Sequence, residues 1–124
     1  MSCIPDCQSE AIFDPSVLQS LLESNEPDKL LPVYRSYADH MTGQLTRLRE
    51  IDPESDSEKI QLLAHQLKSS NSAVGARRMA SCLMELDKVA GNEELERIRS
   101  CLDILYQCWN DTELALIKYM DELT

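Results

Sequence analysis

The sequence predicts an all-α protein, an antiparallel four-helix bundle with a short additional N-terminal helix. The composition favours helices, because the 124 residues include only three glycines and 5% aromatic residues, whereas strong helix formers such as Leu, Glu, Ala and Lys are abundant. Apolar residues also recur every three or four positions through most of the chain. With 43% hydrophobic and 27% charged residues, the composition is that of a folded globular domain.

The sequence of the N-terminal region predicts a loose arm followed by a short helix. Residues 1–12 carry little apolar pattern, so we expect a loose arm there and a single helical domain over 13–124. The short helix is expected to begin at Asp14, which caps it, with Pro15 at the first helical position. Pro27 interrupts its apolar pattern.

The long helices are separated by proline and glycine. The second helix should begin between Pro27 and Pro32, since proline is tolerated only in a first turn or at a kink, and should stop at Pro53. The remaining three helices are expected over 57–73, 76–90 and 92–122. Gly75 should break the chain between the first two of these, and Gly91 should follow the next as a glycine beyond the helix C-terminus.

Charge and hydropathy restrict the partners. The net charge of −10 disfavours nucleic acid and anionic membrane surfaces, which both attract basic proteins. No apolar run approaches the roughly 20 residues of a membrane span, and the start MSCIPDCQSE lacks a signal-peptide core. We therefore expect a cytoplasmic protein, and Met1 and the lack of flanking kinase segments indicate a free-standing domain.

The cysteines do not form a recognisable framework. Five cysteines in a chain without a signal peptide indicate reduced thiols. Cys82, Cys101 and Cys108 fall at apolar helix positions, where cysteine behaves as a small hydrophobe. Cys3 and Cys7 could form half of a metal site, but no second pair accompanies them, so no bound metal is expected.

The predicted helix over 57–73 turns a histidine toward water. At about 100° per residue, Leu63, Ala64, Leu67 and Val74 fall within about 60° of Ile60 and form one apolar face with it. His65 lies at about 140° on the same wheel, away from that face. A solvated histidine without a role remains an alternative at this point. The other histidine, His40, has no following lysine or small-residue run and is expected to be a surface residue.

The neighbours of His65 favour a chemical role. Lys68 and Ser69 follow it by three and four positions and therefore share its surface. Ser69 and Ser72 are short, so a partner can approach the ring. An exposed imidazole is partly neutral near pH 7 and can act as a nucleophile, and the lysine supplies a compact positive charge. These residues therefore indicate a site that carries a phosphoryl group exposed to solvent.

These residues resemble the histidine-containing phosphotransfer (HPt) domains of bacterial two-component phosphorelays. The signature of that family can be written H-x-L-K-G-x5-G, with an acidic or amide residue about 22 positions after the histidine. The matching residues here are His65, Leu67, Lys68, Gly75 and Asp87. Ser69 replaces the usual glycine, and Asp87 stands where the family often has Glu or Gln, so its shorter side chain leaves its reach to the imidazole open.

The resemblance implies a role for each site residue. His65 would be the nucleophile and phosphoryl carrier through Nε2, and Lys68 would steady the phosphoryl oxygens. Asp87 would orient the imidazole by holding its Nδ1–H. Ser69 and Gly75 would be permissive small residues, the first beside the ring and the second in the turn between helices.

The resemblance also implies partners, namely receiver domains of response regulators and of hybrid histidine kinases. The receiver would bring its own Mg²⁺, so no cofactor is expected on this chain, and the chain would be a monomeric phosphocarrier without kinase activity. Docking would use Leu62, Ser72, Arg77 and Arg78 around the histidine. Burial of Leu62 against a neighbouring helix, and a merely solvated role for the arginines, remain alternatives.

Two other functions compete with the phosphocarrier. A helical adaptor or inhibitor could bind a receiver or histidine kinase without carrying phosphate, although it would need neither His65 nor Lys68. A structural bundle with a thiol-metal site would rest on the cysteine count alone.

Overall fold

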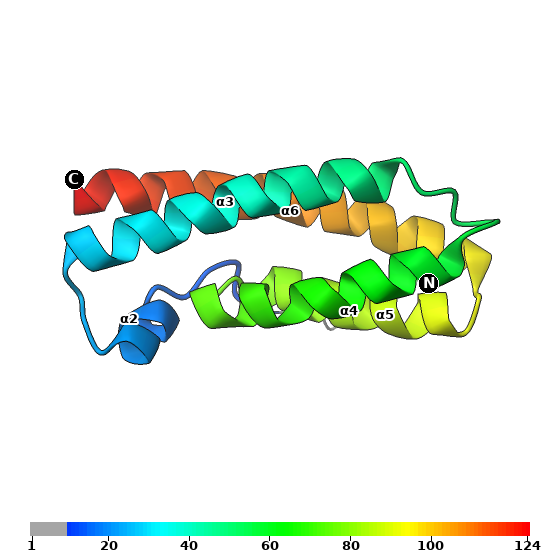
Figure 1. Ribbon diagram of the computed structural model, residues 1–124, viewed down its shortest axis with the longest axis horizontal. Coiled ribbons are helices and arrows are strands. Elements are labelled where there is room, and N and C mark those ends of the chain that lie inside the picture. The colour runs from blue at the N-terminus through cyan, green and yellow to red at the C-terminus, as the bar shows by residue number, and fades with distance from the viewer. Residues whose placement is uncertain (1–9) are drawn as a thin grey trace.

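The computed structural model describes residues 10–124, and within them it contains five helices and no strand. The helices are α2 (Ser16–Leu22), α3 (Pro27–Arg49), α4 (Ser57–Val74), α5 (Arg77–Gly91) and α6 (Leu95–Leu123). Figure 1 shows α3 and α6 along one side of the bundle and the α4–α5 hairpin along the other, with α2 at the end where α4 stops. The all-α bundle with an extra N-terminal helix is confirmed.

One hydrophobic core joins all five helices. On α4 the predicted apolar face is buried: Ile60, Leu63, Ala64, Leu67 and Val74. Asn71 is also fully buried on this face, where the periodicity predicts nothing polar. Its side chain accepts a hydrogen bond from the Tyr37 hydroxyl of α3 and donates one of 2.8 Å to the Leu67 carbonyl, so its burial is compensated.

The N-terminal segment packs on the turn between α4 and α5. Helix α2 begins one residue later than predicted, because Asp14 accepts hydrogen bonds from the backbone and hydroxyl of Ser16 and leaves Pro15 at the N-cap. The Asp14 amide donates to the Gly75 carbonyl at 2.8 Å. Arg78 donates to the Glu10 carbonyl through its side chain and to the Ala11 carbonyl through its backbone. These contacts fix α2 beside α4.

The two glycines predicted at helix ends behave differently. Gly75 caps α4 in the left-handed region, with φ 84°, as predicted for a helix breaker. The prediction for Gly91 is wrong, because it is the last residue of α5 and the left-handed residue that follows the helix is Glu93, with φ 55°. Gly91 instead allows a close approach, since a Cβ there would lie 2.6 Å from Nε2 of Gln61.

The remaining local predictions concern proline and cysteine. Helix α3 begins at Pro27 and continues through Pro32. Cys101 and Cys108 are buried free thiols, whereas Cys82 is disulfide-bonded, so the prediction of a reduced thiol is wrong there. Cys3 and Cys7 lie outside the described residues, as does most of the predicted arm.

Membrane-spanning helices and clustered metal ligands are both absent from residues 10–124. None of the helices described is long and apolar enough to cross a membrane. In the same part of the chain, no three side chains of His, Cys, Asp or Glu gather as a metal site.

Candidate functional site

Helix α4 presents His65 to solvent. The buried neighbours Leu63, Ala64 and Leu67 anchor the opposite face of the helix, and 68% of the His65 side chain is exposed. The outward orientation expected from the helical wheel is therefore observed.

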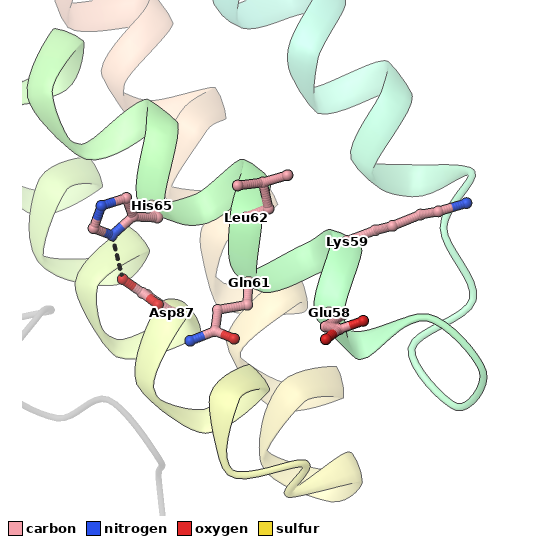
Figure 2. A pocket seen from close by; sticks show the side chains of 6 residues that line it. All are labelled: Glu58, Lys59, Gln61, Leu62, His65 and Asp87. Carbon is pink, nitrogen blue, oxygen red and sulfur yellow. Dashed lines mark hydrogen bonds and ion pairs between the residues drawn. The ribbon is translucent and has the colours of Figure 1, made fainter.

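Asp87 of α5 contacts the imidazole. Its Oδ2 lies 3.0 Å from Nδ1 of His65, and Figure 2 shows the other ring nitrogen directed away from the carboxylate. A carboxylate can only accept, so the pair selects the tautomer with hydrogen on Nδ1 and leaves the Nε2 lone pair free. The shorter side chain of Asp87 therefore does reach the imidazole of His65.

Lys68 reaches the same carboxylate oxygen. Its Nζ donates to Oδ2 of Asp87 at 2.9 Å, and only 16% of the Asp87 side chain is exposed. Burial would raise the pKa of Asp87, but hydrogen bonds from Lys68, His65 and Gln61 outweigh it and hold the pKa below its ordinary value. Asp87 is therefore an anion at neutral pH, shared between the imidazole and the ammonium group.

A pocket of about 440 Å³ opens beside the imidazole. It is lined by Glu58, Lys59, Gln61, Leu62, His65 and Asp87. Leu62 is 58% exposed, so its burial against a neighbouring helix is excluded. Helical spacing alone does not distinguish Gln61 as a site residue, although its place one turn before His65 puts it on the same surface.

A second pocket lies on the other flank, next to the short serines. Exposed Ser69 and Ser72 line it together with Lys68. Helix α2 adds Leu21 and helix α5 adds Met84, and both are exposed. The apolar periodicity of the sequence does not reveal these two side chains as site residues, because each lies on the outer face of its own helix.

The two predicted docking arginines are held by the N-terminal segment. Arg77 lies 3.5 Å from the Asp14 carboxylate. Arg78 is partly buried and donates to the carbonyls of Glu10 and Ala11. Neither is therefore a simple solvated side chain.

The second histidine is set apart from this cluster. His40 is exposed on α3, beside a groove lined by apolar and hydroxyl-bearing residues such as Val33, Ser70 and Ala73. This agrees with the surface position expected for it.

Comparison with known proteins identifies the family. No curated protein and no solved structure matches the chain. The model of the Hpt domain family matches residues 30–123, which is more than half of the chain and includes α4, α5 and the whole His65–Lys68–Asp87 cluster. The chain therefore belongs to the Hpt domain family of phosphotransfer proteins.

Proposed function

We propose that this protein is a phosphorelay intermediate that accepts a phosphoryl group on His65 from a receiver aspartate and passes it to the aspartate of another receiver. Hpt domains are phosphocarriers in phosphorelays and interact with receiver domains and kinases. The observation that supports His65 as the phosphoryl carrier is the His65–Asp87 pair, which leaves Nε2 free on an exposed ring.

The transfer follows from that tautomer. The Nε2 lone pair attacks phosphorus, the Nε2–P bond forms, and the P–O bond of the aspartyl phosphate breaks with its electron pair on the departing carboxylate. No proton needs to move, because the hydrogen stays on Nδ1. The ring becomes cationic, and the Asp87 carboxylate at 3.0 Å compensates that charge. The reverse steps deliver the group to the next aspartate.

Lys68 would stabilise the phosphoryl oxygens. Its ammonium group lies on the His65 side of α4 and is already held at Oδ2 of Asp87. A dianionic phosphoryl group on Nε2 offers it a second anionic partner, and a flexible lysine can move between the two. Ser69 leaves room for this group beside the ring.

The receiver would supply the rest of the machinery. We expect it to bring the Mg²⁺, so this chain needs no cofactor and has no kinase activity of its own. Docking would use the exposed Leu62 on one flank of His65 and Ser72 with Met84 on the other, and Arg77 and Arg78 would extend this surface from the start of α5. A monomer in the cytoplasm suits this role, because the same face must meet successive partners.

The test is labelling by a phosphorylated receiver, or by a hybrid kinase with ATP. Wild-type protein should acquire acid-labile, base-stable label, and His65→Gln should not. His40→Gln is the matched control and should label like wild type. Tight receiver binding by the wild-type protein, without label from any cognate donor, would refute the carrier in favour of the non-phosphorylated adaptor.

A further inference from the structure

The antiparallel register of α4 and α5 aligns two pairs of residues. His65 of α4 lies against Asp87 of α5. One turn earlier on α4, Gln61 lies against Gly91, which is one turn later on α5. Residues four apart share a helix face, so the Gln61–Gly91 contact and the His65–Asp87 contact are adjacent along one interhelical seam.

Gly91 is the residue that lets Gln61 lie flat on α5. A Cβ at position 91 would be 2.6 Å from Nε2 and 3.2 Å from Cδ of Gln61. Real side chains do not tolerate the shorter of these contacts, so any other residue would move the Gln61 amide. The backbone of Gly91 does not require a glycine by its conformation, since Gly75 is the only glycine described with positive φ.

The amide of Gln61 is directed toward the carboxylate that orients His65. Figure 2 shows its side chain crossing from α4 to α5 next to Asp87, within the pocket that both residues share with His65. The amide also contributes, with Lys68 and His65, to the stabilisation of the Asp87 anion. Gln61 therefore lies beside the orienting residue in the pocket that Gln61, Asp87 and His65 line together.

We propose that Gln61 is a positioning residue for phosphotransfer, holding the Asp87 carboxylate in line with His65 Nδ1, and that Gly91 provides the space in which it does so. The inference rests on the proposed function of His65. Without the Gln61 amide, the carboxylate is free to rotate toward Lys68, which competes for the same oxygen. The Nδ1–H tautomer of the His65 ring is then less strongly favoured over the Nε2–H tautomer.

The first measurement is the tautomer of His65 in the unphosphorylated protein, read from the ¹⁵N chemical shifts of its ring. Gln61→Ala should lower the ratio of the Nδ1–H to the Nε2–H tautomer by about 2-fold or more, the equivalent of one weakened hydrogen bond. Gly91→Ala should lower it in the same direction although Gln61 is intact. Gln66→Ala, which removes an exposed glutamine of α4, is the control and should leave the ratio unchanged.

The second measurement is the rate of phosphoryl acceptance from a phosphorylated receiver. Gln61→Ala and Gly91→Ala should each slow it by about 2- to 10-fold. Because both changes act through one amide, the double variant should be no slower than Gln61→Ala alone. The thermal unfolding midpoint of Gly91→Ala should not fall, since alanine favours a helix more than glycine does, which separates positioning from a loss of structure.

The outcomes separate this inference from the proposed function. An unchanged tautomer ratio in Gln61→Ala, or a further effect of Gly91→Ala in that background, would overturn the positioning role even if His65 is labelled normally. If the ratio shifts as expected but His65 is never labelled, Gln61 still positions the imidazole and the phosphocarrier proposal fails.

Discussion

Lys68 donates a 2.9 Å hydrogen bond to Oδ2 of Asp87, the same oxygen that lies 3.0 Å from His65 Nδ1. One partly buried carboxylate oxygen thus contacts both the group expected to carry phosphate and the group expected to stabilise it. The Lys68 ammonium group therefore lies next to the His65–Asp87 pair before any phosphoryl group is bound.

Lys68→Ala should slow phosphoryl transfer and shorten the lifetime of the phosphohistidine. The variant removes the positive charge but leaves the His65–Asp87 pair in place. Ion pairs near the surface contribute little to folding, so the free energy of unfolding should stay within about 1 kcal/mol of wild type. Transfer rates and phosphohistidine decay, measured beside a urea unfolding curve, check this. Equal kinetics in both proteins would remove Lys68 from the mechanism.

Asp87 should make folding stability depend on acid. Its pKa is lower in the folded protein than its ordinary value of 3.8. A lowered folded pKa stabilises the protein above the unfolded pKa, and this stabilisation is lost as the pH falls through the folded pKa. Asp87→Asn should therefore lose less stability than wild type as the pH falls below about 4. Urea unfolding at a series of pH values measures the difference.

The same position allows a test of rescue. Asp87→Gln introduces an amide of the kind that the family often has here, and its oxygen can still accept from Nδ1–H. It should retain most of the transfer activity, whereas Asp87→Leu should lose more, because no acceptor then selects the tautomer. Similar rates in the two variants would argue that Asp87 does not orient the ring.

Removing the hydroxyl from each of two buried tyrosines of α3 should have different effects on folding stability. Tyr37 donates to buried Asn71, so Tyr37→Phe leaves the Asn71 oxygen unsatisfied and should cost about 1–3 kcal/mol of stability. The Tyr34 hydroxyl is buried without a hydrogen-bond partner among the described residues. Tyr34→Phe keeps its edge contacts with Phe13 and Tyr119 and should leave stability unchanged or raise it by up to about 1 kcal/mol.

Chemical denaturation of the two variants provides the comparison. Each change removes one oxygen from a buried ring on the same helix, so each is the control for the other. If Tyr37→Phe proved as stable as Tyr34→Phe, the buried Tyr37–Asn71 pair would contribute nothing to the fold.

The contrast between these residues shows what local sequence can and cannot predict. The phase of α4 depends only on helical geometry, so the buried Leu67 and the exposed His65 follow from spacing. Asn71 sits on the buried face because Tyr37, from a different helix, satisfies it. No pattern within α4 contains that partner.

The residues of the candidate site likewise differ in whether spacing within one helix predicts their positions. Lys68 is placed beside His65 by helical spacing, but the contact between Gln61 and Gly91 depends on the register between α4 and α5. The prediction of Gly91 as a helix terminator is therefore wrong, since a glycine near a helix end fits that role as well as it fits close packing. The reach of Asp87 to the ring is a property of the same register.

Gly75 is the residue at which the turn, α2 and the site depend on one another. Its left-handed φ of 84° strains any residue with a side chain, and a Cβ there would lie 2.0 Å from the Asp14 carbonyl oxygen, a backbone atom that cannot rotate away. Gly75→Ala should therefore lose at least about 2 kcal/mol of stability. It should also displace α2 and with it Leu21, which lines the pocket beside Ser69.

Gly43→Ala is the matched control for this change. Gly43 lies inside α3, and nothing lies within 4 Å of a Cβ added there. Alanine should raise stability by about 0.5–1 kcal/mol, because glycine inside a helix loses more backbone entropy on folding. Urea unfolding and receiver affinity should separate the two variants, with Gly43→Ala more stable and unaltered in affinity and Gly75→Ala weakened in both. A stable Gly75→Ala with normal receiver affinity would mean that α2 does not depend on the close approach of Asp14 to this turn.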